Sequence, residues 1–238
     1  MAIKGLLLSL ATLLCILSPV SITSCASQPS ACEHADVFHP SAKQLFNEVA
    51  LPTYKVLASS ESGDWSGSAV AIGTNTLVTA AHVVTDVVPL KSIYVFSKLG
   101  KKKVIASAKV LKADIKSDLA VITTDVPLPY WAEVMAREEI AEFARWGSRV
   151  WVSGHALGCD EPVITDGTIN STDDFGFIRY SAAQIFGNSG GPVFARTPSG
   201  FKVMSIAQAG YVSGFSMVTH MSLGANPYTL NTFLFGGK

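Results

Sequence analysis

The sequence predicts an all-β domain. From residue 52 onward, short segments rich in β-branched and aromatic residues recur, and clusters of Gly, Asn and Ser separate them. Hydrophobic residues make up 48% of the 238 residues and charged residues only 15%, which is typical of a folded globular protein. Many short strands with turns between them indicate a sandwich or a barrel, and the spacing alone leaves both open.

The expected strands form two groups with one helical segment between them. Residues 133–146 are rich in helix formers with apolar positions at helical spacing, and Gly147 ends the pattern. A short closing helix is expected at about 227–234. The strands of the first group are expected at 54–57, 68–73, 76–79, 92–96, 104–112 and 119–122, and those of the second at 149–153, 162–170, 177–182, 193–195, 201–208 and 215–220.

Residues 1–24 are expected to be a secretory signal peptide. Lys4 precedes an uncharged apolar run, and small residues follow it, which is the order of regions in such signals. Residues 5–22 approach the length of a membrane span, but Pro19, with Ser and Thr after it, favours a signal that is removed. We therefore expect the protein to be exported.

Cys25 is a candidate site for a lipid that would anchor the exported protein to a membrane. The stretch Ile22-Thr23-Ser24-Cys25 resembles the lipobox of bacterial lipoproteins, which implies cleavage before Cys25 and a lipid on its thiol. The alternative is an ordinary signal peptide cut near Ala26. In the first case the protein would be a lipoprotein anchored to the membrane, on the periplasmic or cell-surface side, and in the second it would be secreted. Residues 25–50 would then be a tether and lead-in to a domain at 51–238.

Two further cysteines remain after processing. With Cys25 lipidated, Cys32 and Cys159 would be left as a pair that an oxidising compartment allows to bridge, and two free thiols fit the sequence equally well. The chain has no Cys-x-x-Cys and no Cys/His cluster at metal spacing, so we expect no metal site. A formal net charge of zero gives no basic field for nucleic acid.

A serine surrounded by glycines is the first candidate for catalysis. In Gly187-Asn188-Ser189-Gly190-Gly191-Pro192, the glycines allow positive φ, so backbone N–H groups can converge on one point. The N–H groups of Gly187 and Ser189 are the candidate oxyanion donors. A serine hydroxyl also needs a base within reach and an acid that orients the base.

His82 and Asp118 are the candidates for those two roles. His82 follows a strand and two alanines, where a tight turn begins. Asp118 heads a strongly apolar strand, where a carboxylate would be partly buried and able to accept the Nδ1 proton of the imidazole. Asp114 and Asp86 are rivals for the acid, and the position at the head of the strand favours Asp118.

The three blocks that contain His82, Asp118 and Ser189 together resemble the catalytic blocks of trypsin-like serine peptidases, in that family's order. Residues 154–158 and 163–169 make the chain most similar to the bacterial HtrA and glutamyl-endopeptidase branch. The resemblance implies two antiparallel six-stranded β-barrels, at about 51–130 and 147–238, a C-terminal helix and a triad in the cleft between them. The chain ends soon after the expected closing helix, so we expect no PDZ module.

The same resemblance implies a primary substrate pocket. Its floor lies six residues before the nucleophile, at Ala183, and its walls would come from Ser205, Ala207 and Ser216. With no carboxylate there, we expect an uncharged or apolar residue before the cut. Thr219 and His220 nearby leave glutamate specificity as an alternative. His155, in a loop that the family places near the oxyanion hole, either touches substrate or is a surface histidine.

The predicted function is that of a serine endopeptidase that works through an acyl-enzyme and needs no metal or organic cofactor. Its partners would be a protein or peptide substrate and, through the lipid, a membrane, and we expect a monomer. The alternative is a catalytically silent relative that binds protein partners.

Overall fold

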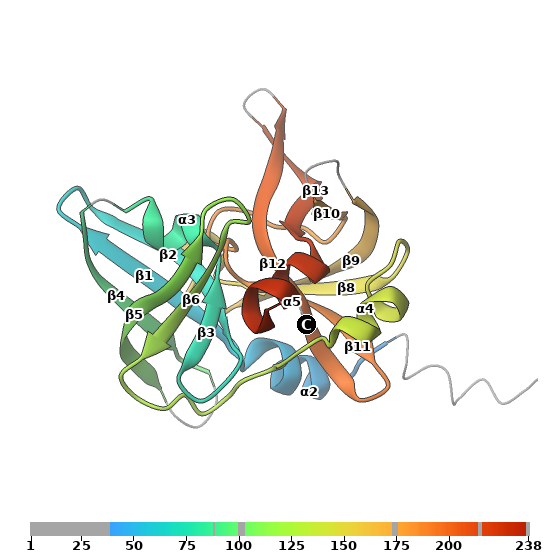
Figure 1. The fold of residues 1–238 in the computed structure, drawn as a ribbon, viewed down its shortest axis with the longest axis horizontal. Coiled ribbons are helices and arrows are strands. Elements are labelled where there is room, and N and C mark those ends of the chain that lie inside the picture. Colours follow the sequence, from blue (N-terminus) through green and yellow to red (C-terminus); the bar gives the residue numbers. More distant parts are fainter. Residues whose placement is uncertain (1–38, 88, 100–102, 173–175, 214–215, 237–238) are drawn as a thin grey trace, which may run out of the picture. The chain divides into compact units, whose positions relative to one another are not determined.

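Two β-barrels, one after the other along the chain, make up the structure, a computed structural model that describes residues 39–87, 89–99, 103–172, 176–213 and 216–236 (Figure 1). The predicted signal peptide, Cys25, Cys32 and the first part of the predicted lead-in lie outside these residues. The first barrel is coloured blue to green and the second yellow to red.

The first barrel closes six antiparallel strands in the order β1-β2-β3-β6-β5-β4. Along β1, Tyr54, Val56 and Ala58 are fully buried and alternate with partly exposed residues, which is the period of two that a barrel wall requires. Leu77, Ile93, Val95 and Ile122 join them in the barrel core. The strands are β1 (Thr53–Ser60), β2 (Asp64–Ala71), β3 (Thr76–Thr79), β4 (Leu90–Ser97), β5 (Val104–Asp114) and β6 (Leu119–Thr124), and helix α3 (Ala81–Thr85) follows β3.

The second barrel closes six antiparallel strands in the order β11-β8-β9-β10-β13-β12, because β11 also pairs with β12. Val150, Val152, Tyr180 and Met204 lie in its core. The strands are β8 (Arg149–Gly154), β9 (Val163–Thr172), β10 (Phe177–Tyr180), β11 (Pro192–Thr197), β12 (Gly200–Ser213) and β13 (Ser216–Ala225), with the short helix η2 (Ala156–Gly158) after β8. The two six-stranded antiparallel barrels that the resemblance implied are confirmed.

A third apolar cluster fixes the barrels to each other. Val70 and Leu119 from the first barrel pack in one cluster with Trp151 and Phe201 from the second. The rings of Trp151 and Phe201 meet edge to face with centroids 5.0 Å apart. The expected C-terminal helix, α5 (Pro227–Phe235), adds Leu230 and Phe233. Because the cluster is dry and shared, side chains from the two barrels that meet in the cleft are held in a fixed relation.

The segment expected to be helical at 133–146 is only partly so. Helix α4 spans Arg137–Phe143, and Glu133–Val134 instead form β7, which pairs in parallel with Lys202–Val203 of β12. The N–H of Met135 continues this pairing by donating to the carbonyl of Val203, so tertiary pairing overrides the helical propensity at this end. Glu139 accepts a hydrogen bond from the N–H of Ala136 and starts the helix there.

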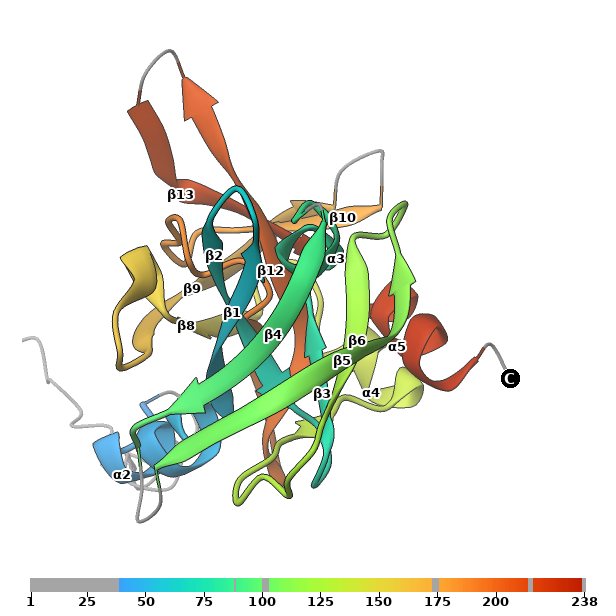
Figure 2. The same cartoon turned by 90° about the vertical axis from the view of Figure 1, so that its left-hand side faces the viewer.

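Residues 42–50, assigned to the lead-in, are helical. They form α2 (Ala42–Gln44) and η1 (Leu45–Ala50), in which Val49 and Ala50 are buried. The hairpin of β12 and β13 is longer than expected and projects beyond its neighbours in two views (Figures 1 and 2).

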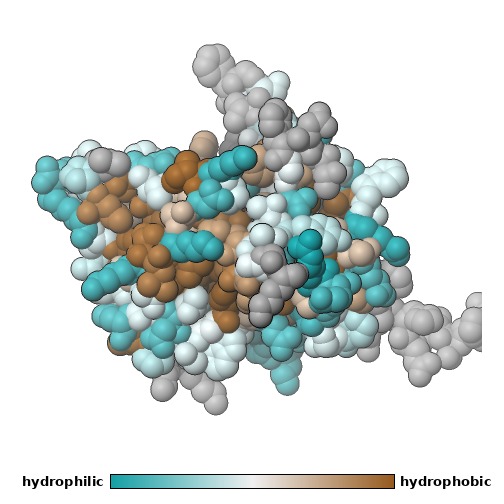
Figure 3. All heavy atoms as spheres, viewed as in Figure 1, coloured by the Kyte–Doolittle hydropathy of each residue, from teal (hydrophilic) through white to brown (hydrophobic). Residues whose placement is uncertain are grey.

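Hydrophobic residues gather on part of the surface over β5 and β6 (Figure 3). Ile105 and Leu111 of β5 and Ile115 after it are each more than half exposed. Among the described residues, the helices are too short or too polar to cross a membrane.

Candidate active site

His82 enters the cleft from α3, which begins where β3 ends. Val83 and Val84 are buried and anchor the helix, and small Ala80 and Ala81 let the chain turn tightly. The carboxylate of Asp118 accepts two hydrogen bonds from this residue, from the backbone N–H at 2.9 Å and from the ring Nδ1 at 2.8 Å. Because the carboxylate only accepts, Nδ1 carries the proton and Nε2 is the basic nitrogen of the ring.

Asp118 has an unusual backbone that the structure supports. Its φ is +51°, a left-handed conformation that costs energy for a residue with a Cβ. The side-chain amide of Gln208 donates to the carbonyls of Ser117 and Asp118, at 2.7 and 2.8 Å, and holds this turn. Asp114, the rival candidate, instead accepts hydrogen bonds from Lys116 and Ser117 within the turn.

The contact between these residues changes the basicity of the imidazole. The hydrogen bond that the ring donates to Asp118 raises the pKa of His82 above its usual 6.5. Burial opposes this effect, and the charges of Asp118 and Asp86 act in the same direction as the hydrogen bond. The imidazolium that forms when this ring accepts a proton is therefore stabilised.

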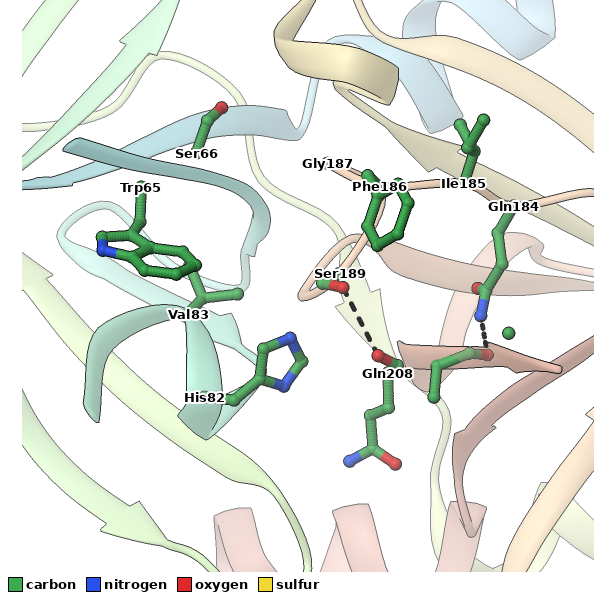
Figure 4. Close-up of a pocket in the computed structure, with 12 residues that line it drawn as sticks. Trp65, Ser66, His82, Val83, Gln184, Ile185, Phe186, Gly187, Ser189 and Gln208 are labelled. Carbon is green, nitrogen blue, oxygen red and sulfur yellow. Dashed lines mark hydrogen bonds between the residues drawn. The ribbon is translucent and has the colours of Figure 1, made fainter. Parts of the chain in front are cut away.

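Ser189 lies across the cleft from His82, in a loop that we call the nucleophile loop, residues 185–191 (Figure 4). Gly190 has a φ of +84°, and a Cβ there would lie 2.1 Å from the hydroxyl of Thr79, so only glycine fits. The hydroxyl of Ser189 donates to the carbonyl of Gln208 at 3.3 Å, and no hydrogen bond joins it to His82 among the described residues. Catalytic contacts often tighten only when substrate binds, and a rotation about the Cα–Cβ bond re-aims the hydroxyl.

The peptide group before Gly187 has its direction fixed by a hydrogen bond. The N–H of Leu157 donates to the carbonyl of Phe186 at 2.6 Å, so that carbonyl points toward η2. In a trans peptide the C=O and N–H point in opposite directions, so the N–H of Gly187 points away from η2. The arrangement suits an oxyanion donor beside Ser189.

A pocket of about 460 Å³ joins these groups. His82 and Ser189 both line it. The other lining residues come from β2 and α3 on one side and, on the other, from β12 and from the nucleophile loop with Gln184 directly before it: Trp65, Ser66, Val83, Gln184, Ile185, Phe186, Gly187, Gln208, Ala209 and Gly210.

Gln184 crosses this pocket. Its amide nitrogen donates to the carbonyls of Ala209 and Leu223, and its oxygen accepts from the hydroxyl of Tyr180 at 2.8 Å. Burial raises the pKa of Tyr180, so its phenol stays protonated and can donate. Gln184 is only 6% exposed. Its side chain thus links one wall of the pocket to the neighbouring strands and occupies the space between them.

Comparison with known proteins agrees with this geometry. The family described as trypsin-like peptidase domain matches residues 67–199, which contain His82, Asp118 and Ser189. The chain belongs to the trypsin-like peptidase family. A search of curated proteins gave no match.

Two solved structures of proteases share the fold of this peptidase domain. The serine endoprotease from Yersinia pestis is 21% identical with a TM-score of 0.67, and the match covers 82% of this chain and 66% of that one. A variant of the HtrA-type protease AlgW, solved with a tripeptide, is 22% identical with a TM-score of 0.66, and the match covers 82% and 62%. This chain therefore spans less than two thirds of either relative.

The residues predicted to line the pocket of the peptidase lie elsewhere. Ser205 and Ala207 are fully buried in the second barrel, where the hydroxyl of Ser205 donates to the carbonyl of Ala225. Ser216 is exposed at the start of β13. Ala183 directly precedes Gln184 but does not line the described pocket. The wall positions are taken instead by Gln184, Gln208 and the residues that follow each of them.

The remaining predicted residues divide between described and undescribed parts. Cys159 is exposed, and its predicted partner Cys32 lies outside the described residues. His155 is 1% exposed and does not line the pocket; its Nδ1 bonds the carbonyl of Cys159. His220 is exposed on β13 and is not among the residues that line the pocket. Within the described part of the chain, no group of three or more His, Cys, Asp or Glu side chains is arranged to hold a metal.

Proposed function

We propose that this chain is a serine endopeptidase that hydrolyses peptide bonds through an acyl-enzyme on Ser189. The observation that carries the proposal is the double hydrogen bond from His82 to Asp118, which leaves a basic Nε2 in the pocket that also contains Ser189. A histidine with a purely structural role would not need both a charged partner and a serine of a glycine-rich loop in the same pocket.

In the proposed mechanism, the hydroxyl of Ser189 leaves the carbonyl of Gln208 and turns to Nε2 of His82. The oxygen attacks the scissile carbonyl while Nε2 takes its proton, and the N–H groups of Gly187 and Ser189 stabilise the negative oxygen. His82 then gives the proton to the leaving amine. Water, activated by the same nitrogen, hydrolyses the ester, and Asp118 stabilises the imidazolium in both steps.

We further propose that a small, uncharged residue precedes the cut. The pocket walls next to Ser189 include Ile185, Phe186 and Ala209, and the amide of Gln184 is held across the interior. A charged side chain would enter this space without a partner for its charge, which is unfavourable. The glutamate alternative has less support, because His220 is not among the residues that line the pocket.

A peptide library varied only at the residue before the cut tests both proposals. Wild-type protein should cleave peptides with Ala, Val or Ser there, and Ser189→Ala should lose about a millionfold in kcat. Ser199→Ala, an exposed serine in the turn after β11, is the matched control and should keep wild-type rates. A dominant signal for Lys, Arg or Glu would contradict the pocket assignment, and equal inactivity of wild type and Ser189→Ala would favour the silent, binding relative.

We also propose that the protein is exported and tethered through a lipid on Cys25. The support is the signal pattern of residues 1–24 and the lipobox-like stretch before Cys25. Intact mass of the membrane-extracted protein tests it: loss of 24 residues with an added lipid agrees, and an unmodified chain that begins near Ala26 contradicts it. The same spectrum without reductant reports whether Cys32 and Cys159 are bridged.

A further inference from the structure

Ser68, on β2 of the first barrel, holds the nucleophile loop of the second barrel. Its backbone N–H donates to the carbonyl of Ser189 at 2.8 Å, and its hydroxyl donates to the carbonyl of Gly187 at 2.7 Å. The residue is 0% exposed, so water does not compete for these bonds. The two carbonyls belong to the residues whose N–H groups are the proposed oxyanion donors.

The direction of the hydroxyl is fixed by a second neighbour. The N–H of His155 donates to the oxygen of Ser68 at 2.8 Å. An amide N–H only donates, so the hydroxyl accepts from His155, and its own hydrogen goes to the carbonyl of Gly187. The carbonyl of Ser68 is occupied as well, by the hydroxyl of Thr79 at 2.7 Å. Every polar atom in this contact therefore has one defined role.

Gly187 is the point at which the loop needs such support. Its φ is +92°, and a Cβ there would lie 2.3 Å from the carbonyl oxygen of His155. Glycine is required by that close packing, yet glycine restricts its own φ and ψ least of all residues. Hydrogen bonds must therefore orient the peptide groups on both sides. Leu157 holds the carbonyl of Phe186 on one side, and Ser68 holds the carbonyl of Gly187 on the other.

We propose that Ser68 is a positioning residue for the oxyanion hole: through its hydroxyl and its N–H it holds the peptide groups that follow Gly187 and Ser189, and thereby restrains the backbone of the two donor residues. It does not touch the reacting atoms. Without the hydroxyl, the peptide between Gly187 and Asn188 loses this restraint. Gly187 can then change its φ and ψ, and its own N–H is no longer held toward the developing oxyanion. The proposal rests on the proposed function, because the hole matters only in an enzyme that forms an acyl intermediate.

The test compares Ser68→Ala with Ser97→Ala. Ser97 is a buried serine on β4 of the same barrel, and within the described part of the chain its hydroxyl oxygen accepts from the N–H of Leu99 and bonds no residue of the nucleophile loop. Complete loss of one oxyanion donor lowers kcat about a hundredfold to a thousandfold, so a misplaced donor should lower it by about tenfold to a hundredfold. We expect KM to change less than about threefold, because the lost interaction is made in the transition state.

Two further readouts separate positioning from general destabilisation. Affinity for a peptide boronic acid, which forms a tetrahedral adduct with the serine, should weaken by the factor by which kcat/KM falls. The acid limb of the pH–rate profile should stay in place, because the contact between His82 and Asp118 is untouched. Ser97→Ala should change Tm at most and leave kcat and boronate affinity at wild-type values.

A second variant keeps the test decisive if Ser68→Ala fails to unfold cooperatively. Ser68→Cys fills the same space with a weaker donor and should show the same split between kcat and KM with a smaller loss. Values of kcat for the Ser68 variants within about twofold of Ser97→Ala would overturn the positioning role while leaving the enzyme intact. A wild-type protein that neither cleaves peptides nor binds the boronic acid would instead overturn the proposed function.

Discussion

Replacing Asp118 with Asn should lower kcat about ten-thousandfold, the magnitude known for the equivalent change in enzymes with this triad. The reason lies in the two hydrogen bonds that the carboxylate accepts, from the N–H of His82 at 2.9 Å and from its Nδ1 at 2.8 Å. Asn has one oxygen and one amino group to offer at these two places. The backbone N–H always donates, so it takes the oxygen.

The amino group then faces Nδ1 and must donate to it. The imidazole proton is forced onto Nε2, the nitrogen that has to accept the proton of Ser189. The variant should therefore fold and bind peptide with a KM near that of the wild type while kcat falls. In the opposite orientation the amino group of Asn would face the backbone N–H of His82, and two donors without an acceptor between them are also unfavourable.

The same substitution should move the pH dependence. His82 acts as a base only when neutral, and its raised pKa places the acid limb of kcat/KM above pH 6.5 in the wild type. Without the carboxylate the pKa of His82 falls, so the acid limb moves to lower pH.

The raised pKa of His82 also affects stability. Protonated His82 contributes stability below pH 6.5, and this contribution is lost as the pH rises through the folded pKa. Asp118→Asn should thus lower Tm more at about pH 6 than at about pH 9.

The assay is the pH profile of kcat/KM on one cleaved peptide, with thermal unfolding at each pH. Asp114→Asn is the matched control, since Asp114 lies in the same turn, is exposed and bonds only its own neighbours. It should keep wild-type kinetics. A kcat for Asp118→Asn within tenfold of the wild type, or a large loss in Asp114→Asn, would refute the assignment of the acid.

Two other changes have defined outcomes. Gly187→Ala places a Cβ 2.3 Å from the carbonyl of His155 and should lower kcat about a hundredfold to a thousandfold with little change in KM; wild-type kcat would contradict its role as a donor. Gln184→Ala opens the pocket and should raise kcat/KM for Leu or Met before the cut relative to Ala, whereas Gln184→Met, which keeps the volume, should not. An unchanged profile in Gln184→Ala, measured with the peptide library, would show that this side chain does not limit the pocket.

That His82, Asp118 and Ser189 form one candidate site could be predicted from sequence, because their surroundings are local. The glycines around Ser189 and the apolar strand after Asp118 are consequences of positive φ and of burial, and both are visible in the amino-acid order. The role of Ser68 left no such trace, because its partners at 155, 187 and 189 are far away in the chain. Only the packing of one barrel on the other brings them together.

The pocket residues were misplaced for a different reason. The resemblance to the family placed Ser205 and Ala207 in the pocket wall, by alignment of residues 203–208 with one strand of that family. In the structure Ala207 pairs with Gly224 and Ala209 pairs with Leu223, so Gln208 is an extra residue in a bulge. A bulge re-aims the side chains on either side of it, and its position depends on pairing with a distant strand.

Labelling with a fluorophosphonate tests the central claim most directly, because the reagent requires an activated serine and leaves a stable adduct. We expect one phosphonyl group per chain, mapped by peptide mass to Ser189, absent in Ser189→Ala and formed far more slowly in Asp118→Asn. A folded wild-type protein that stays unlabelled, or an adduct on another residue, would contradict it.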